Sequence, residues 1–409
     1  MLKNHYRSID FLRGLGVFFV LVLHTSFYYY ADIYDVDIAN PSLIITLIGF
    51  LLMFAGLFAM LSGLSYTIQY LKAKTELEKN NRLKHMSLSG FLLLIVAYIY
   101  FIFTGPGIIH FDTRSMDESL IVSLINQGSF QKLTQERLFY VDSLVMLSLN
   151  IFLMTLLFKV IKKQFNKPHT ARNILMLAVV FLVISYVRIP LYNVYLSALD
   201  SHHYFVVILL NWFVGKNNPI LPFFAFALFG VWTALLLKQV DKKQLKHHML
   251  PVILVMIVVG VSGYLLTPET MLERAIDPTW YFIMVIQIGL FLGMILAGLI
   301  FFDFNNRKNN PLTRFISRFG VSGLTPFFLE QIISALIFLL MRQLFNIQFG
   351  MIGAILYGFS LALAWGVFLI FWEKKQYKYG IEWAMSKMLN QFSPSSKLKK
   401  LAGERHELD

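Results

Sequence analysis

The stretch FLRGLGVFFVLVLHTSFYYY, residues 11–30, decides the fold. Arg13 and His24 are its only basic residues, and it contains no acidic residue. An apolar helix of about 20 residues is long enough to cross the hydrocarbon core of a bilayer. The run is also longer than the apolar part of a cleavable signal peptide, which covers roughly 7 to 15 residues. We therefore predict a first transmembrane helix that stays in the protein.

Further apolar runs of similar length follow along the chain. They lie near residues 42–71, 86–103, 141–161, 172–192, 219–238, 249–266, 279–302, 319–341 and 350–372. Hydrophobic residues make up 57% of the sequence and charged residues only 14%. A soluble fold of this composition would expose a large apolar surface to water. The sequence therefore predicts an all-α integral membrane protein with about ten transmembrane helices.

Three segments outside these runs have a pattern of their own. Tyr204 to Val214 is apolar but short and is followed by the helix-breaking residues 215–219, so we predict a re-entrant or interfacial segment. The outer loop 104–140 opens with a Gly-Pro-Gly turn and is expected to cap an outer cavity. We assign residues 1–375 to one transmembrane domain. Residues 376–409 form a cytoplasmic tail, in which apolar residues at helical spacing from Ile381 to Phe392 predict an interfacial amphipathic helix.

The distribution of lysine and arginine predicts the orientation of the chain. The segments 1–13, 72–85, 159–172, 238–248, 303–318 and 373–409 hold 29 of the 36 basic residues. Cytoplasmic loops retain such residues, so both termini are predicted to be cytoplasmic. The net charge of +13 then reflects topology and attraction to anionic lipid in the plasma membrane. We expect the lipid bilayer as a partner and no nucleic acid. The sequence contains no cysteine, which excludes disulfides and thiolate metal sites, and no metal site is predicted.

The first helix carries three ionisable residues that share a face. Arg13 and His24 are eleven residues apart, which returns them to within roughly 20° of the same face, about 16 Å apart along the axis. Asp10 lies one turn below Arg13 on this stripe. An ionisable side chain inside a bilayer is costly, and burial disfavours the charged form of an imidazole, so His24 would be a neutral base. Two simpler interpretations remain open. His24 can be a packing residue that is held by a hydrogen bond, and Asp10 and Arg13 can form an ion pair at the membrane interface.

Several motifs resemble known membrane acyltransferases. The run from Arg7 to Gly14, followed by the arginine, ten residues, histidine spacing that ends at His24, resembles the first-helix signature of the membrane-bound acyltransferase-3 family. Its Asp, x, x, Arg, Gly start is also similar to the heparan-glucosaminide N-acetyltransferase-like proteins. Weaker similarities follow in the same order along the chain, at residues 61–65, 219–230, 318–331 and 379–383.

The resemblance implies acyl transfer from a cytoplasmic thioester, acetyl-CoA in the first place, to a hydroxyl or amine of a cell-envelope or exported glycan. In that reaction His24 would be the general base or would carry the acyl group itself. Arg13 would bind the CoA phosphates, Asp10 would fix the position of Arg13, and Arg314 and Arg318 are further phosphate candidates. Each of these two arginines, taken singly, can also be a basic residue that only keeps its helix end on the cytoplasmic side.

Polar residues in other helices could complete the site. Glu330 lies mid-membrane, where a carboxylate needs a partner. It either orients His24 as a third group in a triad, or pairs with an arginine or stays protonated. The candidates for binding the acceptor are its neighbour Gln331 and, near the outer membrane boundary, Asp142 and Arg188. The last two also fit residues that only face lipid headgroups.

Two other functions compete with the enzyme. A transporter or flippase for a glycan or small metabolite could use the same polar stripe as its pathway, although it predicts inverted repeats that the sequence lacks. A non-catalytic membrane scaffold would tolerate replacement of Arg13 and His24. A homodimer is expected by analogy only.

Overall fold

The computed structural model describes residues 5–37, 54–165, 167–267, 276–305 and 310–391. Helices make up nearly all of its regular structure, and one two-stranded hairpin is the only sheet within these ranges. Nine helical segments in the same ranges are long and apolar enough to cross a membrane. The predicted all-α polytopic membrane fold is therefore confirmed. The predicted span at 42–71 is described only from residue 54 onward.

The described helices, turns and strands follow one another along the chain. In chain order they are α1 (Arg7–Tyr28), a 3₁₀ turn (Ile33–Asp35), α3 (Ala55–Lys72), α4 (Glu76–Phe103), β1 (Ile108–His110), β2 (Ser115–Asp117), α5 (Leu120–Gln127), α6 (Gln135–Phe139), α7 (Ser143–Val160), α8 (Thr170–Ile184), a 3₁₀ turn (Ser185–Val187), α9 (Arg188–Asp200), α10 (Tyr204–Val214), α11 (Ile220–Gln239), α12 (Lys242–Leu266), α13 (Pro278–Gly298), a π-helical turn (Leu299–Phe304), α14 (Pro311–Val321), α15 (Leu324–Phe345), α16 (Met351–Glu373) and α17 (Ile381–Gln391).

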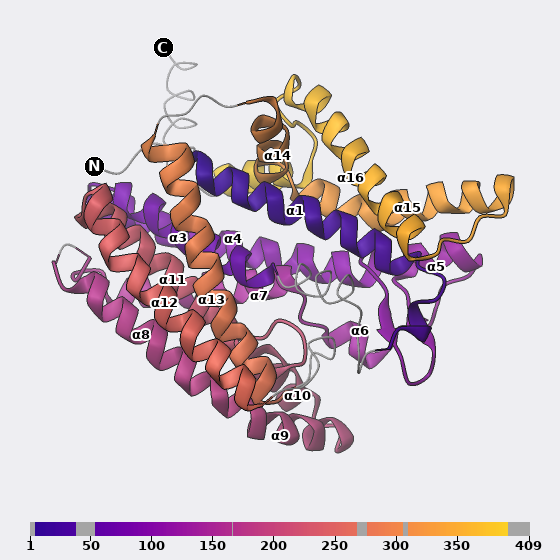
Figure 1. Ribbon diagram of the computed structural model, residues 1–409, viewed down its shortest axis with the longest axis horizontal. Coiled ribbons are helices and arrows are strands. Elements are labelled where there is room, and N and C mark those ends of the chain that lie inside the picture. The colour runs from indigo at the N-terminus through magenta and orange to yellow at the C-terminus, as the bar shows by residue number, and fades with distance from the viewer. Residues whose placement is uncertain (1–4, 38–53, 166, 268–275, 306–309, 392–409) are drawn as a thin grey trace, which may run out of the picture.

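Helix α1 runs through the middle of the bundle, with α14 and α16 above it and α3 below it in Figure 1. It approaches α14 closely because both helices carry glycine at the contact. A Cβ atom on Gly320 would lie 1.9 Å from the backbone oxygen of Asp10, and one on Gly14 would lie 2.0 Å from that of Ile316. The start of α1 is held by Asp303 in the π-helical turn, whose carboxylate accepts the backbone N–H groups of Arg7 and Ser8 at 2.9 and 3.2 Å. These bonds satisfy N–H groups that have no partner within the helix.

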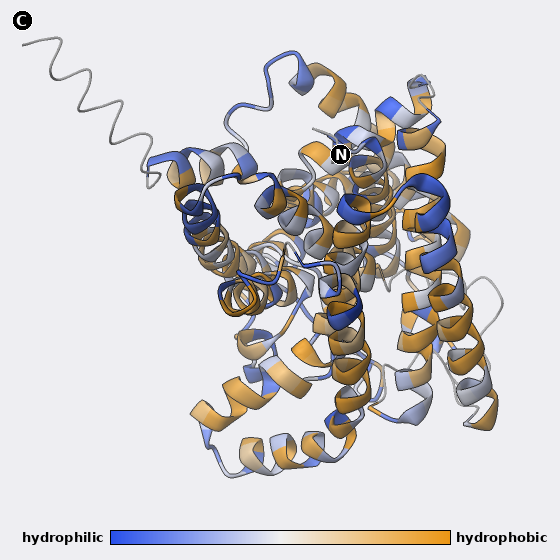
Figure 2. Cartoon of the chain, turned by 90° about the vertical axis from the view of Figure 1, so that its left-hand side faces the viewer, coloured by the Kyte–Doolittle hydropathy of each residue, from blue (hydrophilic) through white to orange (hydrophobic). Residues whose placement is uncertain are grey.

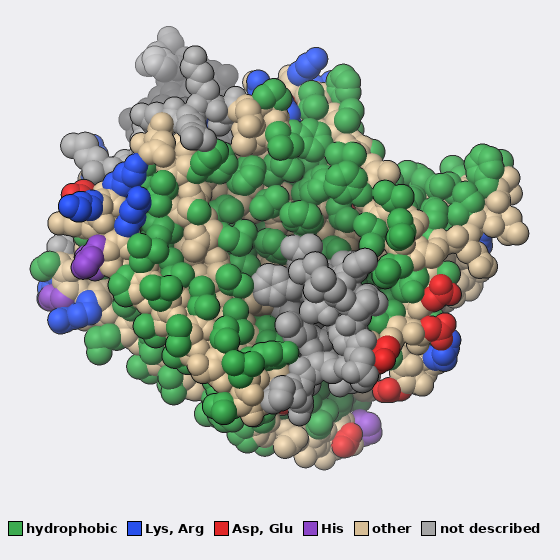
Figure 3. Space-filling model, in the orientation of Figure 1, with side chains coloured by type: hydrophobic (Ala, Val, Ile, Leu, Met, Phe, Trp, Pro, Cys, Tyr) green, Lys and Arg blue, Asp and Glu red, His purple; other side chains and the backbone are tan. Residues whose placement is uncertain are grey.

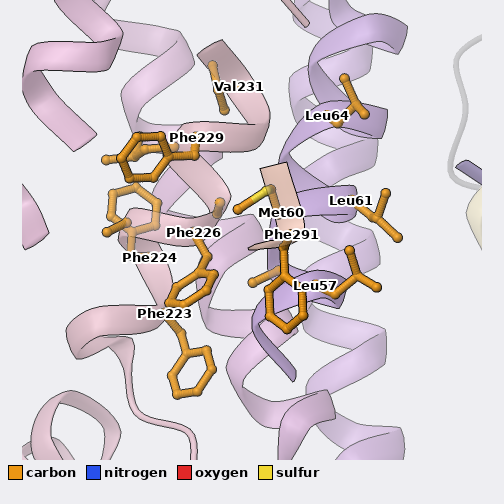
Figure 4. Packing of buried hydrophobic residues seen from close by; sticks show 14 of the residues in the cluster. Leu57, Met60, Leu61, Leu64, Phe223, Phe224, Phe226, Phe229, Val231 and Phe291 are labelled. Carbon is orange, nitrogen blue, oxygen red and sulfur yellow. The ribbon is translucent and has the colours of Figure 1, made fainter. Parts of the chain in front are cut away.

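The largest apolar core lies between α3 and α11. All of α11 from Ile220 to Leu237 is buried, which explains why its composition is apolar on every face. Figure 4 shows phenylalanines of α11 beside Leu57, Met60 and Leu61 of α3, with Phe291 of α13 next to them. Gly230 packs on the backbone of α3, since a Cβ there would meet the Met60 oxygen at 1.9 Å. This glycine and Gly63 belong to segments in which the sequence resembles known acyltransferases, and here both serve close helix packing.

Three predicted spans differ in extent from the helices that contain them. The span predicted at 86–103 belongs to α4, which begins at Glu76 because Thr75 and Glu78 form a capping box. The span predicted at 172–192 continues through a 3₁₀ turn to Asp200. The span predicted at 319–341 is two helices, α14 and α15, separated at Ser322, where the backbone is not helical. The apolar run hides this break, since hydropathy alone carries no information on backbone angles.

An outer module follows α4 and covers one end of the bundle. It consists of β1 and β2, paired with Ile109 opposite Met116, and of α5 and α6. Arg137 of α6 is 1% exposed and fastens this module to the bundle. Its guanidinium donates to Asp117 at 2.9 Å, to the Phe101 carbonyl at 2.7 Å and to the Pro106 carbonyl at 3.1 Å. A buried charge with this many partners is well compensated, and removing one partner would be costly.

Polarity is distributed along the bundle axis, as a membrane environment requires. In Figure 2 the sides of the helices are apolar and the polar residues gather at their ends. On the face drawn in Figure 3, Lys and Arg gather mainly at the end where α1 begins, and most Asp and Glu lie at the opposite end. We call the latter the outer end, following the predicted orientation. The 11-residue α10 packs against α9 near this end and is too short to span the bilayer.

Candidate active site

His24 and Glu330 form a hydrogen-bonded pair inside the bundle. The two atoms, Nδ1 of His24 and Oε1 of Glu330, are 2.6 Å apart. The side chain of Glu330 is 2% exposed and that of His24 is 21% exposed. The packing of α1 against α15 brings them together across 306 residues of sequence. Phe327, one turn before Glu330, places its ring 5.7 Å from the imidazole and restricts its orientation.

Tyr100 of α4 completes the group, and the sequence analysis missed it. Its hydroxyl donates to the same Glu330 oxygen at 3.2 Å, and the residue is 1% exposed. Its ring lies 4.7 Å from that of Phe327. The chain has 19 tyrosines, and nothing in the local pattern around Tyr100 separates it from tyrosines that only pack.

This arrangement assigns different roles to the two nitrogens of His24. An ionised carboxylate can only accept, so Glu330 holds a proton on Nδ1 and leaves the lone pair on Nε2. The hydroxyl of Tyr100 supplies a second donor to the buried carboxylate oxygen, which lowers the cost of keeping a charge there. The group therefore has the form of an imidazole base oriented by a carboxylate, as in catalytic triads.

A cavity of about 520 Å³ extends from His24 towards the outer end. Its walls come from the ends of α1, α3, α4, α7, α13 and α15, from the connections after α1 and before α11, and from the outer module. They include Val20, His24, Tyr28, Phe58, Tyr100, Phe101, His110, Asp112, Glu136, Tyr140, Asp142, Lys216, Asn217, Asn218, Trp280 and Phe327. His24 and Tyr100 thus lie at the inner part of a space that could admit a ligand from outside.

Asp142 lines this cavity and also begins α7. Its Oδ1 accepts the backbone N–H of Val145 at 2.8 Å, as an N-cap does. Its Oδ2 is buried and has no hydrogen-bond partner among the described residues. The prediction placed Asp142 at an acceptor entrance, and the structure places it in the wall of the cavity that holds His24.

On the cytoplasmic half of α1, Arg13 lies between three helices. It donates to Ser65 of α3 at 3.2 Å and to the Gly320 carbonyl of α14 at 3.4 Å, and it is not part of the cavity wall. Among the described residues, the carboxylate of Asp10 binds His5 at 2.8 Å and forms no ion pair within 4.0 Å with Arg13.

The other predicted binding residues lie away from His24 or make structural contacts. Arg314 and Arg318 both bind Glu373 at the end of α16, at 3.3 and 2.8 Å. Arg188 is buried and donates to the carbonyls of Gly215 and Lys216, after the end of α10, so the structure does not bring it to the cavity. Gln331 is fully buried beside Glu330, and its amide atoms have no partner among the described residues.

The tail reaches back to the helix that carries Glu330. Gly323, at the start of α15, offers no side-chain cap. Glu382 of α17 takes this role: it accepts the N–H groups of Leu324 at 2.5 Å and Thr325 at 3.2 Å, and its other oxygen accepts the Thr325 hydroxyl at 2.5 Å. The backbone N–H of Ile381 donates to the same hydroxyl at 2.8 Å. The predicted amphipathic tail helix is thus present as α17, and its first turn is fixed to α15.

Replacing Glu382 with alanine should destabilise the fold. The change leaves two backbone N–H groups of α15 without an acceptor, a loss of about 1 to 2 kcal/mol by comparison with other helix caps. Thermal unfolding of the detergent-solubilised protein measures the effect. Ser386→Ala, an exposed change on the same helix, is the control and should leave the melting temperature unchanged. An equal melting temperature for Glu382→Ala would show that the cap contributes nothing.

No group of three or more His, Asp or Glu side chains in the described ranges is arranged to hold a metal ion.

In comparisons with known proteins, the family described as heparan-alpha-glucosaminide N-acetyltransferase, catalytic, matches residues 5–265. The match covers Arg13, His24, Tyr100 and Asp142 and ends before α15, which carries Glu330. No individual curated protein gives a significant match.

Proposed function

Because the chain belongs to the family of the heparan-alpha-glucosaminide N-acetyltransferase catalytic domain, and is thus a transmembrane acetyltransferase-like protein, we propose a specific reaction for it. It transfers an acetyl group from cytoplasmic acetyl-CoA to a hydroxyl or amine of a cell-envelope or exported glycan on the outer side of the plasma membrane. Proteins of this family use acetyl-CoA as donor in general. The observation that carries the proposal is the pairing of His24 with Glu330 at 2.6 Å beside an outer cavity.

The reaction needs a proton acceptor at the attacking atom. The acceptor hydroxyl or amine, held in the cavity, attacks the thioester carbonyl while Nε2 of His24 removes its proton. The carbon–sulfur bond breaks, and the CoA thiolate leaves and takes the proton from the imidazolium. Glu330 stabilises the imidazolium while it exists, and Tyr100 fixes the carboxylate. In the covalent variant, Nε2 first takes the acetyl group from CoA and then passes it to the acceptor.

The donor and the acceptor approach His24 from opposite sides. Arg13 lies about 16 Å below His24 on α1, at the cytoplasmic half of the bundle. Its two hydrogen bonds to Ser65 and Gly320 are long, at 3.2 and 3.4 Å, and a guanidinium has five N–H donors. This leaves Arg13 suited to bind a CoA phosphate. Arg314 and Arg318 share the one carboxylate of Glu373, which makes each of them a weaker candidate.

Acetyl-CoA should stabilise the purified protein against thermal unfolding, and this stabilisation should depend on Arg13. A ligand at 100 times its Kd stabilises the native state by about 2.7 kcal/mol. Losing one charge-assisted bond to phosphate, worth about 1.5 to 3 kcal/mol, should weaken binding of acetyl-CoA roughly 10- to 100-fold in Arg13→Ala. Titration of the melting temperature with acetyl-CoA measures both effects.

The matched control for this titration is Arg114→Ala at the outer end, whose guanidinium is exposed and already paired with Asp35. It should respond to acetyl-CoA as the unchanged protein does. Absence of any response to acetyl-CoA in the unchanged protein would contradict the proposed function. If Arg13→Ala and the unchanged protein respond equally to acetyl-CoA, Arg13 does not bind the donor. The proposed reaction is then tested by the variant of His24 alone.

A further inference from the structure

The cavity beside His24 is acidic. Asp112, Glu136 and Asp142 contribute carboxylates to its wall, and Lys216 is the one lysine there among the described residues. His110 in the same wall faces Glu136 at 4.0 Å. In the described wall, three carboxyl groups therefore face one ammonium group, so acidic side chains outnumber basic ones.

The mouth of the cavity strengthens this charge. The connection after α1 supplies Ile33 and Val36 to the wall and carries Asp32, Asp35 and Asp37. Arg114 of the outer module lies next to this connection, but its guanidinium is paired with Asp35 at 2.7 Å. Figure 3 shows Asp and Glu side chains gathered at this end of the molecule. An anion that approaches from the outer side meets a surface of its own sign.

A second observation points to a ligand that donates hydrogen bonds. Asp142 is 6% exposed, and its Oδ2 has no partner in the described part of the chain. A buried carboxylate oxygen without a donor is costly, and an O–H or N–H group of a bound molecule would satisfy it. Tyr140, a partly buried residue of the same wall, adds an aromatic ring of the kind on which sugar rings pack.

We infer that the acceptor taken by this cavity is a neutral or positively charged sugar, bound through a hydroxyl or ammonium group at Asp142, and that carboxylated and sulfated sugars are rejected. This inference rests on the proposed acetyl transfer and adds the charge class of the acceptor. Discrimination of this kind comes from repulsion of the wrong ligand as much as from attraction of the right one.

The test compares three acceptors of nearly equal size with the full-length protein in lipid nanodiscs and acetyl-CoA: methyl glucoside, glucosamine and glucuronic acid. We expect kcat/KM for glucuronic acid to be at least about tenfold below the values for the other two, because like charges in a desolvated site repel strongly. The difference should shrink at high salt if it comes from the exposed mouth. Equal or preferred use of glucuronic acid would overturn the inference.

A charge-reversing variant tests the cause of the selectivity. Glu136 is about half exposed at the rim, and Glu136→Lys should raise the use of glucuronic acid relative to glucosamine about tenfold or more. The control is Asp200→Lys, which changes an exposed acid at the end of α9, outside the cavity wall, and should leave the ratio unchanged. An unchanged ratio in Glu136→Lys would also count against the inference.

Failure of this inference can be told apart from failure of the proposed function. His24-dependent transfer that favours the anionic acceptor overturns the inference and leaves the acetyltransferase in place. If no acceptor is acetylated, the same three sugars are tested as ligands by thermal shift at millimolar concentration. Stabilisation by glucosamine but not by glucuronic acid supports the charge class, and equal stabilisation or none by all three overturns it.

Discussion

Replacing His24 with alanine should abolish acetyl transfer and leave the bundle folded. General-base catalysis alone contributes roughly 10²- to 10⁴-fold, and loss of an acyl carrier would remove the whole reaction. The imidazole lies at a cavity, so its removal enlarges an existing space and does not break a packed core. Release of CoA and acetylation of the acceptor, both measured with labelled acetyl-CoA, should fall to the background rate. Full activity of this variant would end the proposed mechanism.

The same variant separates the two forms of the mechanism. In the covalent form, the unchanged protein takes up labelled acetyl from acetyl-CoA without an acceptor, and His24→Ala does not. In the general-base form, neither protein is labelled. His24→Ala should still be stabilised by acetyl-CoA, because Arg13 and the cytoplasmic half of α1 are unchanged, and this measurement serves as the control for folding and donor binding.

Replacing Glu330 with glutamine should lower kcat by about 10² to 10⁴, with little change in KM for acetyl-CoA, by analogy with catalytic triads. Glutamine keeps the shape of the side chain, but its amide can donate to Nδ1 of His24. The proton then moves to Nε2, and the lone pair that should receive the proton of the acceptor is lost. Steady-state kinetics with varied acetyl-CoA measures this effect.

Two further variants check that the effect comes from the carboxylate. Ser334→Ala removes a hydroxyl from the next turn of α15, where its bond stays within the helix, and should leave kcat unchanged. Tyr100→Phe removes the second donor to Glu330 and should give a smaller loss, on the order of tenfold. If Glu330→Gln keeps full kcat, Glu330 has no part in orienting His24.

The sequence predicts the membrane architecture well, because the lipid solvent alone requires apolar spans and keeps basic residues in the cytoplasmic loops. It also offers the pairing of His24 with Glu330 as one of two interpretations, since a carboxylate in the membrane needs a partner and the first helix has a histidine. The structure contains this hydrogen bond. Tyr100 was not predicted, because its role depends on the position of α4 beside α15, which no local pattern specifies.

Arg188 and Arg314 have partners that the sequence did not indicate. The sequence places each of them along its own helix and does not show which distant segment packs beside it. In the folded chain, Arg188 donates to the carbonyls of Gly215 and Lys216, and Arg314 binds Glu373 of α16. Glu382 shows the same effect, since it caps a helix that begins 58 residues earlier.

The anchoring of α1 limits how this protein can move. Asp303 holds the first turn of α1, and the contacts at Gly14 and Gly320 leave no room for a Cβ atom between α1 and α14. A piston-like displacement of α1 by one turn, about 5.4 Å, would break the first contact and force side chains into the backbone at the second. We therefore expect His24 to keep a constant depth during acetyl transfer. A gate that admits the donor or releases the product would then form by rearrangement of the helices around α1, while α1 itself stays in place.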